Sequence, residues 1–163
     1  MSARHRVWKG GEGDAAALAA LHAPVFPDPW PEAAFASLLS RDEVFVLIGA
    51  RKDKSAPEGF ILVRSVACEA EVLTLCVAVD ARRAGVGNAL LSAACDEARA
   101  RGADGVVLEV GESNSAAVAL YQQAGFTTVG RRAAYYRHGP DAADAIVMKK
   151  VIRDAKAATG PGA

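Results

Sequence analysis

The sequence predicts a mixed α/β (α+β) fold, in which about four helices flank a mostly antiparallel central sheet of about six to seven strands. Two observations predict this class. Residues 72–79 are almost all apolar and β-branched, which is typical of a strand covered on both faces, and a glycine-bearing loop leads from them into an amphipathic helix. Residues 104–110 form a second apolar run after that helix, so the two strands should pair in parallel as a β-α-β unit.

The segment before this unit alternates extended and helical patterns. It predicts strands at residues 6–9, 44–50 and 59–67, and helices from Asp14 to about His22 and from Pro31 to about Leu39. Pro31 suits the first position of its helix, because the N–H that proline lacks is unpaired there. The prolines between residues 24 and 31 exclude regular structure from that stretch.

After the loop, the sequence predicts two helices and, at the C-terminal end, a hairpin. The helix that follows the loop stops at Gly102, and a further helix should run from about residue 115 to 124, capped by Ser113 or Asn114. Strands at residues 127–137 and 144–151 would pair through a turn at residues 138–141. We expect one domain over residues 1–152 and a flexible C-terminal tail over residues 153–163.

The loop at residues 80–87 has the composition of an anion site. Arg82 and Arg83 supply positive charge, while Gly85 and Gly87 lack the Cβ atoms that keep a ligand away from backbone amides. Amides at the N-terminus of a helix favour an anion, typically phosphate. The loop therefore predicts a phosphate-bearing ligand, unless its two glycines merely ease the turn from strand into helix.

Two other kinds of phosphate loop differ from this one in spacing. A Walker loop needs Lys and then Ser or Thr after its last glycine, whereas Asn88 and Ala89 follow Gly87 here. A dinucleotide loop needs a third small residue where Leu90 stands, yet Glu109 occurs about where its ribose-binding acid would. A nucleotide- or dinucleotide-binding module therefore stays open as an alternative.

Residues 82–87, R-R-A-G-V-G, resemble the R/Q-x-x-G-x-G/A acyl-CoA pyrophosphate loop of the GCN5-related N-acetyltransferase (GNAT) family. The likeness spans residues 5–151 and extends to the family's second conserved region, which is matched by residues 108–110, 113–117, 119–121 and 125–126. The resemblance implies the GNAT fold, in which two parallel strands splay apart where the loop begins. It also implies an acetyl-CoA-dependent N-acetyltransferase that acts without a metal or a covalent enzyme intermediate.

Three further segments resemble one group within this family. Residues 26–30, F-P-D-P-W, together with residues 131–132 and 135–136, are similar to the RimI group, whose members acetylate the N-terminus of a small-subunit ribosomal protein. Cys76 and the basic pair at residues 137–138 depart from that group's pattern. Because these departures fall near the implied acceptor site, the acceptor could also be another protein N-terminus, a lysine or a small-molecule amine.

The resemblance assigns roles to individual residues. Glu109 would be the base that takes the proton of the amine through water, and Tyr121 the acid that protonates the departing sulfur. Trp30, Cys76, Tyr135 and Tyr136 would contact the acceptor. Acetyl-CoA would be bound by the strand end, the loop and the two following helices, through Cys76, Val77, Ala78, Val79, Arg82, Arg83, Ala84, Gly85, Val86, Gly87, Asn88, Ala89, Asn114, Ala117 and Tyr121.

Several of these residues also have a plainer interpretation. A carboxylate inside an apolar strand, such as Glu109, must find water, a partner or a function, and it could point to solvent or pair with an arginine. Tyr121 could fill the edge of the core, and Trp30 could be a lid aromatic packed on it. The histidines lack a triad-like context and are interpreted as surface or structural residues: His5, His22 and His138.

Composition restricts the other possible functions. The chain has 163 residues, of which 52% are hydrophobic and 23% charged, and a formal net charge of zero, so nucleic acid is not an expected partner. The N-terminus has no apolar targeting segment and no apolar run is long enough to cross a bilayer, so we expect a cytoplasmic protein with no membrane partner. Cys68, Cys76 and Cys95 have no C-x-x-C spacing, so neither a disulfide framework nor a zinc site is expected.

Two features of the assembly and activity stay open in the sequence. We expect a monomer or a weak homodimer. An acyl-CoA-binding sensor that has lost catalysis is a further alternative to an enzyme, although the presence of both Glu109 and Tyr121 argues against it.

Overall fold

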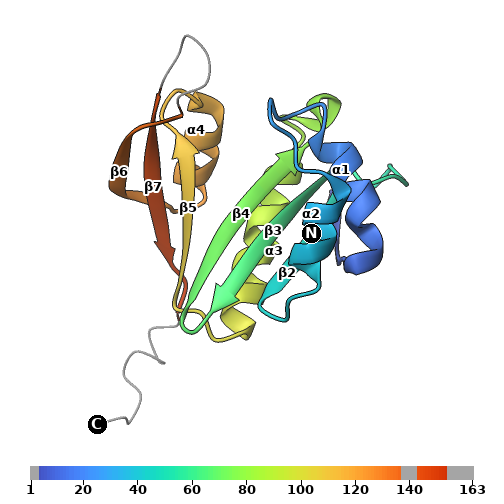
Figure 1. Ribbon diagram of the computed structural model, residues 1–163, viewed down its shortest axis with the longest axis horizontal. Coiled ribbons are helices and arrows are strands. Elements are labelled where there is room, and N and C mark those ends of the chain that lie inside the picture. The colour runs from blue at the N-terminus through green and yellow to red at the C-terminus, as the bar shows by residue number, and fades with distance from the viewer. Residues whose placement is uncertain (1–3, 137–142, 154–163) are drawn as a thin grey trace.

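The computed structural model describes residues 4–136 and 143–153, and these form one seven-stranded sheet with helices on both faces (Figure 1). The strand order in the sheet is β1-β2-β3-β4-β5-β7-β6. The strands are β1 His5–Lys9, β2 Val44–Arg51, β3 Gly59–Val66, β4 Glu69–Val77, β5 Gly105–Gly111, β6 Thr127–Tyr136 and β7 Ala143–Val151. Among these residues β4 and β5 run parallel and every other neighbouring pair runs antiparallel, which confirms the predicted fold class.

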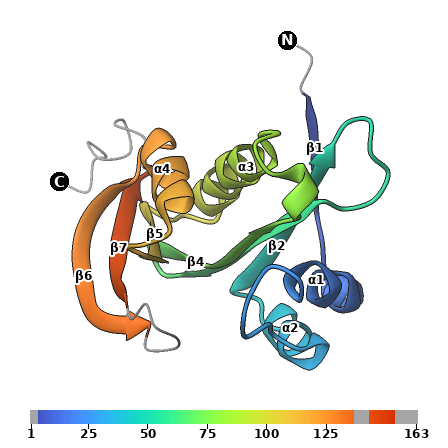
Figure 2. The ribbon, with the colours of Figure 1, turned by 90° about the horizontal axis from the view of Figure 1, so that it is seen from above.

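The helices divide between the two faces of the sheet. They are α1 Ala15–His22, α2 Glu32–Leu39, α3 Val86–Ala100 and α4 Ser115–Gln123, with short 3₁₀ turns at Glu12–Asp14 and Val79–Ala81. Figure 2 shows α3 and α4 on one face and α1 and α2 on the other. Each pair buries its own cluster of side chains against the sheet, one centred on Leu90 and Leu108 under α3 and α4, the other on Phe35 and Phe60 under α1 and α2.

Strand β4 is displaced from the residues that the sequence predicts for it. The sequence predicts a strand at residues 72–79, but β4 begins at Glu69, because the tight turn before it, with Ala67 in a left-handed conformation (φ 54°), returns the chain to the sheet earlier. The strand ends at Val77, since Val79 already belongs to the 3₁₀ turn that opens the loop.

A β-bulge at Leu73 changes which face each part of β4 presents. Leu62 pairs with Thr74 whereas Val63 pairs with Val72, so Leu73 is the extra residue. Side chains alternate along a strand, and one inserted residue reverses that alternation. Val72 accordingly packs in the cluster under α3 and α4, while Cys76, although also even-numbered, packs in the cluster under α1 and α2.

The parallel pair opens towards the carboxyl ends of its strands. Residues Glu69–Glu71 of β4 pair with Gly105–Val107 of β5, and beyond them the two strands diverge, as Figure 1 shows. Strand β5 remains paired with β7 along its whole length, from Gly105 to Gly111. The splayed parallel pair that the resemblance implied is therefore present.

The C-terminal hairpin, β6 and β7, forms the edge of the sheet beyond the splayed pair. Its strands agree with the predicted ones within a residue, and the turn predicted at residues 138–141 lies outside the described residues, as do His138 and the tail at 154–163. Among the described residues, no helix combines the length and the apolar character needed to span a bilayer.

Candidate active site

The loop between β4 and α3 contains two residues in the left-handed conformation. Arg83 has φ 63° and Gly85 has φ 86°, and Gly85 is the N-cap of α3. Glycine adopts this conformation freely, whereas an arginine does so at a cost of about 1–2 kcal/mol. The two reversals turn the chain so that the first turn of α3 begins directly after the loop.

The first turn of α3 lies between the end of β4 and helix α4. A Cβ added to Gly87 would lie 3.4 Å from Leu120 Cδ2 on α4 and 3.5 Å from Val77 Cγ2 on β4. The amides of Val86, Gly87 and Asn88 have no acceptor within the helix, because the first N–H groups of any helix lack one. Together with the positive end of the helix dipole, they are a candidate anion site near Val77, at the carboxyl end of β4.

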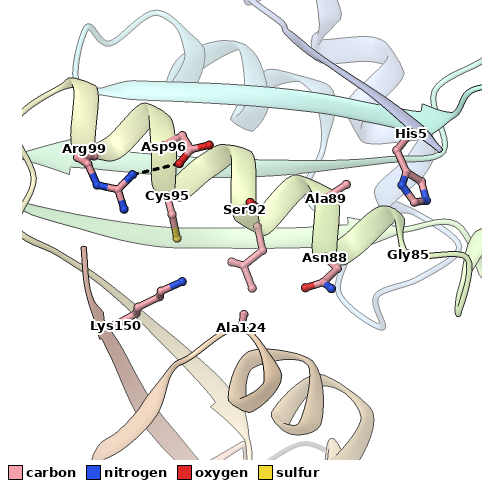
Figure 3. A pocket seen from close by; sticks show the side chains of 11 residues that line it. His5, Gly85, Asn88, Ala89, Ser92, Cys95, Asp96, Arg99, Ala124 and Lys150 are labelled. Atoms are coloured by element: carbon pink, nitrogen blue, oxygen red, sulfur yellow. Dashed lines mark hydrogen bonds and ion pairs between the residues drawn. The ribbon is translucent and has the colours of Figure 1, made fainter. Parts of the chain in front are cut away.

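A groove of about 500 Å³ continues from this turn along the exposed side of α3 (Figure 3). Gly85 and Asn88 lie at its loop end and Arg99 at the far end, and the wall opposite α3 comprises Ala124, which follows α4, and Lys150 of β7. The groove therefore joins the predicted phosphate loop to the space between α3 and α4. Of the residues that the sequence assigns to the cofactor, Gly85, Asn88 and Ala89 line this groove.

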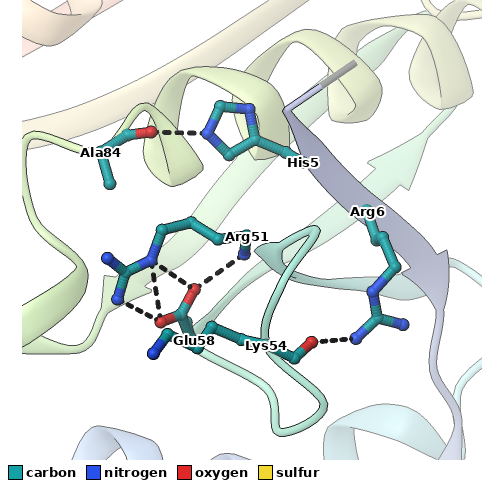
Figure 4. Close-up of polar contacts among 6 residues, drawn as sticks. All are labelled: His5, Arg6, Arg51, Lys54, Glu58 and Ala84. Atoms are coloured by element: carbon teal, nitrogen blue, oxygen red, sulfur yellow. Dashed lines mark hydrogen bonds and ion pairs between the residues drawn. The ribbon is translucent and has the colours of Figure 1, made fainter. Parts of the chain in front are cut away.

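Two distant elements hold this loop from behind (Figure 4). His5 of β1 donates its Nε2–H to the carbonyl oxygen of Ala84 over 2.5 Å. Glu58 accepts bonds from the Arg51 guanidinium, the shortest 2.6 Å, and this bonding lowers the pKa of Glu58; its own carbonyl accepts a 2.8 Å bond from Ala78 N at the end of β4. These contacts place β1 and the β2–β3 hairpin against the loop.

Glu109 lies on the face of the sheet opposite α3 and α4. Its neighbours Leu108 and Val110 are buried under those helices, so the alternation of β5 directs Glu109 to the other side. Its Oε1 atom is 3.1 Å from Arg132 Nη2, and its side chain keeps 30% of its surface exposed. Glu109 therefore pairs with an arginine in the ligand-free protein, as the alternative interpretation expects.

Tyr121 and Asn114 belong to α4, on the other face. Tyr121 is 8% exposed and packs its ring against Phe126 at 5.9 Å in an edge-to-face arrangement, within the cluster that also contains Leu108. Asn114 is the N-cap of α4, because its side chain accepts a 3.2 Å bond from Ala117 N. The structure thus brings Glu109 and Tyr121 to opposite faces of the same part of the sheet, with the cofactor-side helices next to Tyr121.

Comparison with known proteins identifies the family. Residues 15–126 match the model of the acetyltransferase (GNAT) family. The chain belongs to this family. It is 35% identical over 120 residues to the [ribosomal protein bS18]-alanine N-acetyltransferase of Escherichia coli, covering 74% of this chain and 79% of that one, and 39% identical over 144 residues to N-alpha-acetyltransferase RimI of Mycobacterium tuberculosis, covering 84% and 86%.

Solved structures agree with this GNAT assignment. The crystal structure of the ribosomal-protein-S18-alanine N-acetyltransferase from Escherichia coli superposes with a TM-score of 0.86 at 29% identity and covers 98% of both chains. Nourseothricin acetyltransferase has a TM-score of 0.73 at 25% identity, covering 92% of this chain and 99% of that one. The protein is accordingly an N-acetyltransferase, and the predicted family and enzyme class are confirmed.

The face of this GNAT enzyme under α1 and α2 carries an aromatic cluster. His22 is 2% exposed, stacks on Phe26 with ring centroids 4.0 Å apart, and accepts a 3.1 Å bond from Trp30 N at its Nδ1 atom. Its proton therefore resides on Nε2, which lies 3.5 Å from Thr74 Oγ1, and burial lowers the pKa of His22. Trp30 itself is half-buried, with its ring centroid 5.5 Å from that of Phe35. The interpretation of Trp30 as an aromatic packed on the core thus fits, and its remaining surface borders this face.

The structure does not support an acceptor contact for the other three residues assigned to the acceptor. The Cys76 side chain is 0% exposed, its thiol donates to Leu21 O at 3.4 Å, and burial raises its pKa to about 11. A neutral thiol without exposed surface does not fit a side-chain contact with an acceptor, because the bulge directs it into the core. The roles of Tyr135 and Tyr136 concern side chains outside the described residues.

The sequence did not indicate His5, Arg51 or Glu58 as part of the site. His5 and Ala84 are separated by 79 positions, and nothing in the five-residue strand β1 marks it as a neighbour of the loop. The opposite charges at the two ends of the β2–β3 turn were a usable signal for the Arg51–Glu58 pair, since residues flanking a hairpin turn face one another.

Proposed function

We propose that this enzyme transfers the acetyl group of acetyl-CoA to the α-amino group of a protein N-terminus, that of a ribosomal protein. The observation that carries the proposal is the gap between β4 and β5, which opens at Glu71 and Val107 and has the first turn of α3 at its mouth. An extended pantetheine arm can bond to strand backbones in such a gap, and the helix amides can hold the pyrophosphate. The similarity to N-acetyltransferases that act on the alanine of ribosomal protein bS18 supports the acceptor class.

The residues present fit the phosphate groups of acetyl-CoA. The amides of the first turn of α3 and the exposed guanidinium groups of Arg82 and Arg83 would neutralise the pyrophosphate. Leu75 and Val77, half-buried on the side of β4 that faces α3, would contact the arm, and Asn114 and Ala117 would flank it from the start of α4. Acetyl-CoA supplies the activated acetyl group as a thioester.

Glu109 would act as the base for the acceptor. An amine attacks only when neutral, and Glu109 lies on the face away from α3 and α4, where an acceptor can approach without displacing the cofactor-side helices. Its carboxylate takes a proton from the ammonium, through water, and the lone pair of the neutral amine then forms the bond to the acetyl carbon. Trp30 and the segment around it would form the opposite wall of the acceptor groove.

Tyr121 would act as the acid on the other face. As the carbon–sulfur bond breaks, its hydroxyl donates a proton to the thiolate, and the CoA thiol leaves. The nitrogen loses its second proton as it becomes the amide, and this proton restores the Tyr121 hydroxyl through solvent, while the proton held by Glu109 also passes to solvent. The apolar packing of Tyr121 against Phe126 keeps the hydroxyl in a fixed position, which favours proton transfer at one atom. Such direct transfer needs no acyl-enzyme intermediate. The thiols of Cys76 and Cys95 are buried and protonated, so neither is suited to form one.

The test is an acetylation assay with three acceptors at equal concentration. The first is a peptide with the N-terminal sequence of ribosomal protein bS18, the second is the same peptide with its α-amine blocked and a lysine retained, and the third is a small aminoglycoside- or streptothricin-class amine. We expect acetyl transfer to the first peptide alone, located on its N-terminus by mass spectrometry. Transfer to the small amine in preference to the peptide would contradict the acceptor class, and no CoA release with any acceptor would contradict the proposal as a whole. The cytoplasmic location expected for such an acceptor stays a prediction.

A further inference from the structure

The carbonyl group of Ala84 lies between the two left-handed residues of the loop, Arg83 and Gly85. It is directed towards β1, where it accepts the bond from His5 Nε2. In a planar trans peptide the C=O and the following N–H point in opposite directions. Fixing the Ala84 carbonyl towards β1 therefore fixes the Gly85 N–H away from β1.

This peptide is the part of the loop that needs such a restraint. Gly85 has a wide range of accessible backbone angles, so the peptide that precedes it can rotate at a small energetic cost unless a partner holds it. A rotation would exchange the N–H for a carbonyl oxygen, which repels an anion. The strained conformation of Arg83 would also relax more easily, because such a conformation persists only where its surroundings impose it.

His5 contacts the loop through its ring as well as through its hydrogen bond. A Cβ added to Gly85 would lie 2.9 Å from Cε1 and 3.1 Å from Nε2 of His5, so the imidazole packs directly on the glycine backbone. The ring also borders the groove along α3, together with Gly85 and Asn88. Strand β1 is itself fixed, since all five of its residues pair with β2.

We propose that His5 is a positioning residue for the phosphate loop, which orients the Ala84–Gly85 peptide so that its N–H serves the pyrophosphate of acetyl-CoA. This inference rests on the proposed function, because it assumes that the loop binds that pyrophosphate. It predicts an effect on the phosphate-bearing part of the cofactor alone. The thioester and the pantetheine arm lie beyond the reach of this peptide.

The experiment compares His5→Phe, which keeps a ring of similar size without the donor, with His5→Gln, whose amide nitrogen can replace Nε2. Arg6→Gln is the matched control, because Arg6 lies next to His5 on β1 and likewise donates to a backbone carbonyl, that of Lys54, at 2.6 Å, away from the loop (Figure 4). Dissociation constants for CoA are measured by calorimetry. Steady-state kinetics are measured with acetyl-CoA and with S-acetylpantetheine, which has the same thioester and arm but no pyrophosphate.

We expect His5→Phe to weaken CoA binding roughly five- to tenfold, as loss of one hydrogen bond implies, and to lower the preference for acetyl-CoA over S-acetylpantetheine by the same factor. The change should appear in KM for acetyl-CoA with kcat nearly kept. His5→Gln should restore most of the affinity, and Arg6→Gln should bind CoA like the wild type.

Two results would overturn the inference. One is unchanged CoA affinity in His5→Phe, and the other is an equal loss with acetyl-CoA and S-acetylpantetheine, which would make His5 a structural residue only. These outcomes differ from failure of the proposed function, in which the wild-type protein itself would not bind CoA.

Discussion

The candidate sites on the two faces of the sheet differ in composition: one consists mainly of backbone groups and the other of side chains. On the face under α3 and α4, the candidate cofactor site consists mainly of backbone: helix amides, two left-handed residues and a strand end. On the face under α1 and α2, the candidate acceptor site consists of side chains such as Trp30 and Glu109. A backbone site requires only a few glycines and a fixed spacing, whereas a side-chain site depends on which residues several distant elements contribute.

This difference explains why the donor is easier to infer than the acceptor. The pyrophosphate of CoA is the same in every enzyme that uses it, so a common loop conformation suffices for it. Acceptors vary, and their recognition can change by substitution of exposed side chains without altering the fold. Four experiments test this contrast, and the one with the largest expected effect comes first.

The largest effect should come from the two residues with proposed proton-transfer roles. Glu109→Gln and Tyr121→Phe should each lower kcat by roughly 10²–10⁴-fold, because each removes one general base or acid. CoA affinity, measured by calorimetry, should stay nearly constant in both. Glu69→Gln is a suitable control, since Glu69 is another exposed carboxylate paired with a cation, Lys149, at the closed end of the β4–β5 pair. Unchanged turnover in both variants would remove these residues from the mechanism.

Substitution of two glycines distinguishes an effect on CoA binding from a general loss of stability through backbone strain. Gly85→Ala and Gly102→Ala both place alanine in a left-handed conformation, at φ 86° and φ 95°, and each should lower the free energy of unfolding by about 1–3 kcal/mol. Only Gly85 would also bring the new Cβ to 2.9 Å from His5. We therefore expect CoA affinity to fall about tenfold or more in Gly85→Ala and to remain unchanged in Gly102→Ala. Equal affinities would show that the loop conformation does not matter for binding.

The face under α1 and α2 should respond to pH through His22. Burial lowers the pKa of this imidazole in the folded protein below its ordinary value of about 6.5, so the unfolded chain binds the proton more readily. The stability that His22 contributes is fully present above pH 6.5 and declines as the pH falls below it. Thermal midpoints measured from pH 7.5 to 5 should fall more steeply for the wild type than for His22→Gln. Parallel curves would contradict the assignment of a buried neutral imidazole.

The smallest effect should come from the ion pair on the open surface of that face. Arg132→Gln removes the partner that lies 3.1 Å from Glu109, but both side chains are partly exposed. Urea unfolding should therefore show a change of less than about 1 kcal/mol. The same variant should alter KM for the peptide more than KM for acetyl-CoA, since the pair lies away from α3 and α4. A change confined to acetyl-CoA would reverse this assignment of the faces.

Local periodicity sufficed to predict most of the architecture. The β-α-β unit, the loop and the two C-terminal strands have patterns that do not depend on their neighbours, so their predicted bounds agree with the structure within a few residues. The start of β4 and its bulge at Leu73 depend on the register with β3, which the sequence of β4 alone does not contain. The direction of the Cys76 side chain, into the core, follows from that bulge and could not be predicted from β4 alone.

The candidate site was predictable where a local sequence pattern marks it. The glycines at 85 and 87 mark the loop directly, and the alternation of Leu108, Glu109 and Val110 indicates that the carboxylate leaves the core. The contact of His5 with Ala84 joins residues 79 positions apart, and no local pattern records it. The packing of Trp30 likewise depends on the positions of α1 and α2 relative to the sheet.

The short pairing of β4 with β5 gives this enzyme an edge in the middle of its sheet. Beyond Glu71 and Val107 the facing backbones of the two strands present donors and acceptors to each other across a space too wide for a ladder. Exposed strand edges are templates for association with other chains, and proteins usually shorten, charge or cover them. In the binding mode that we propose, the pantetheine arm would cover these edges, because an extended arm in the gap would act as an added strand. The cofactor would then protect the protein against aggregation as well as take part in the reaction, and its concentration would influence how long the enzyme stays usable.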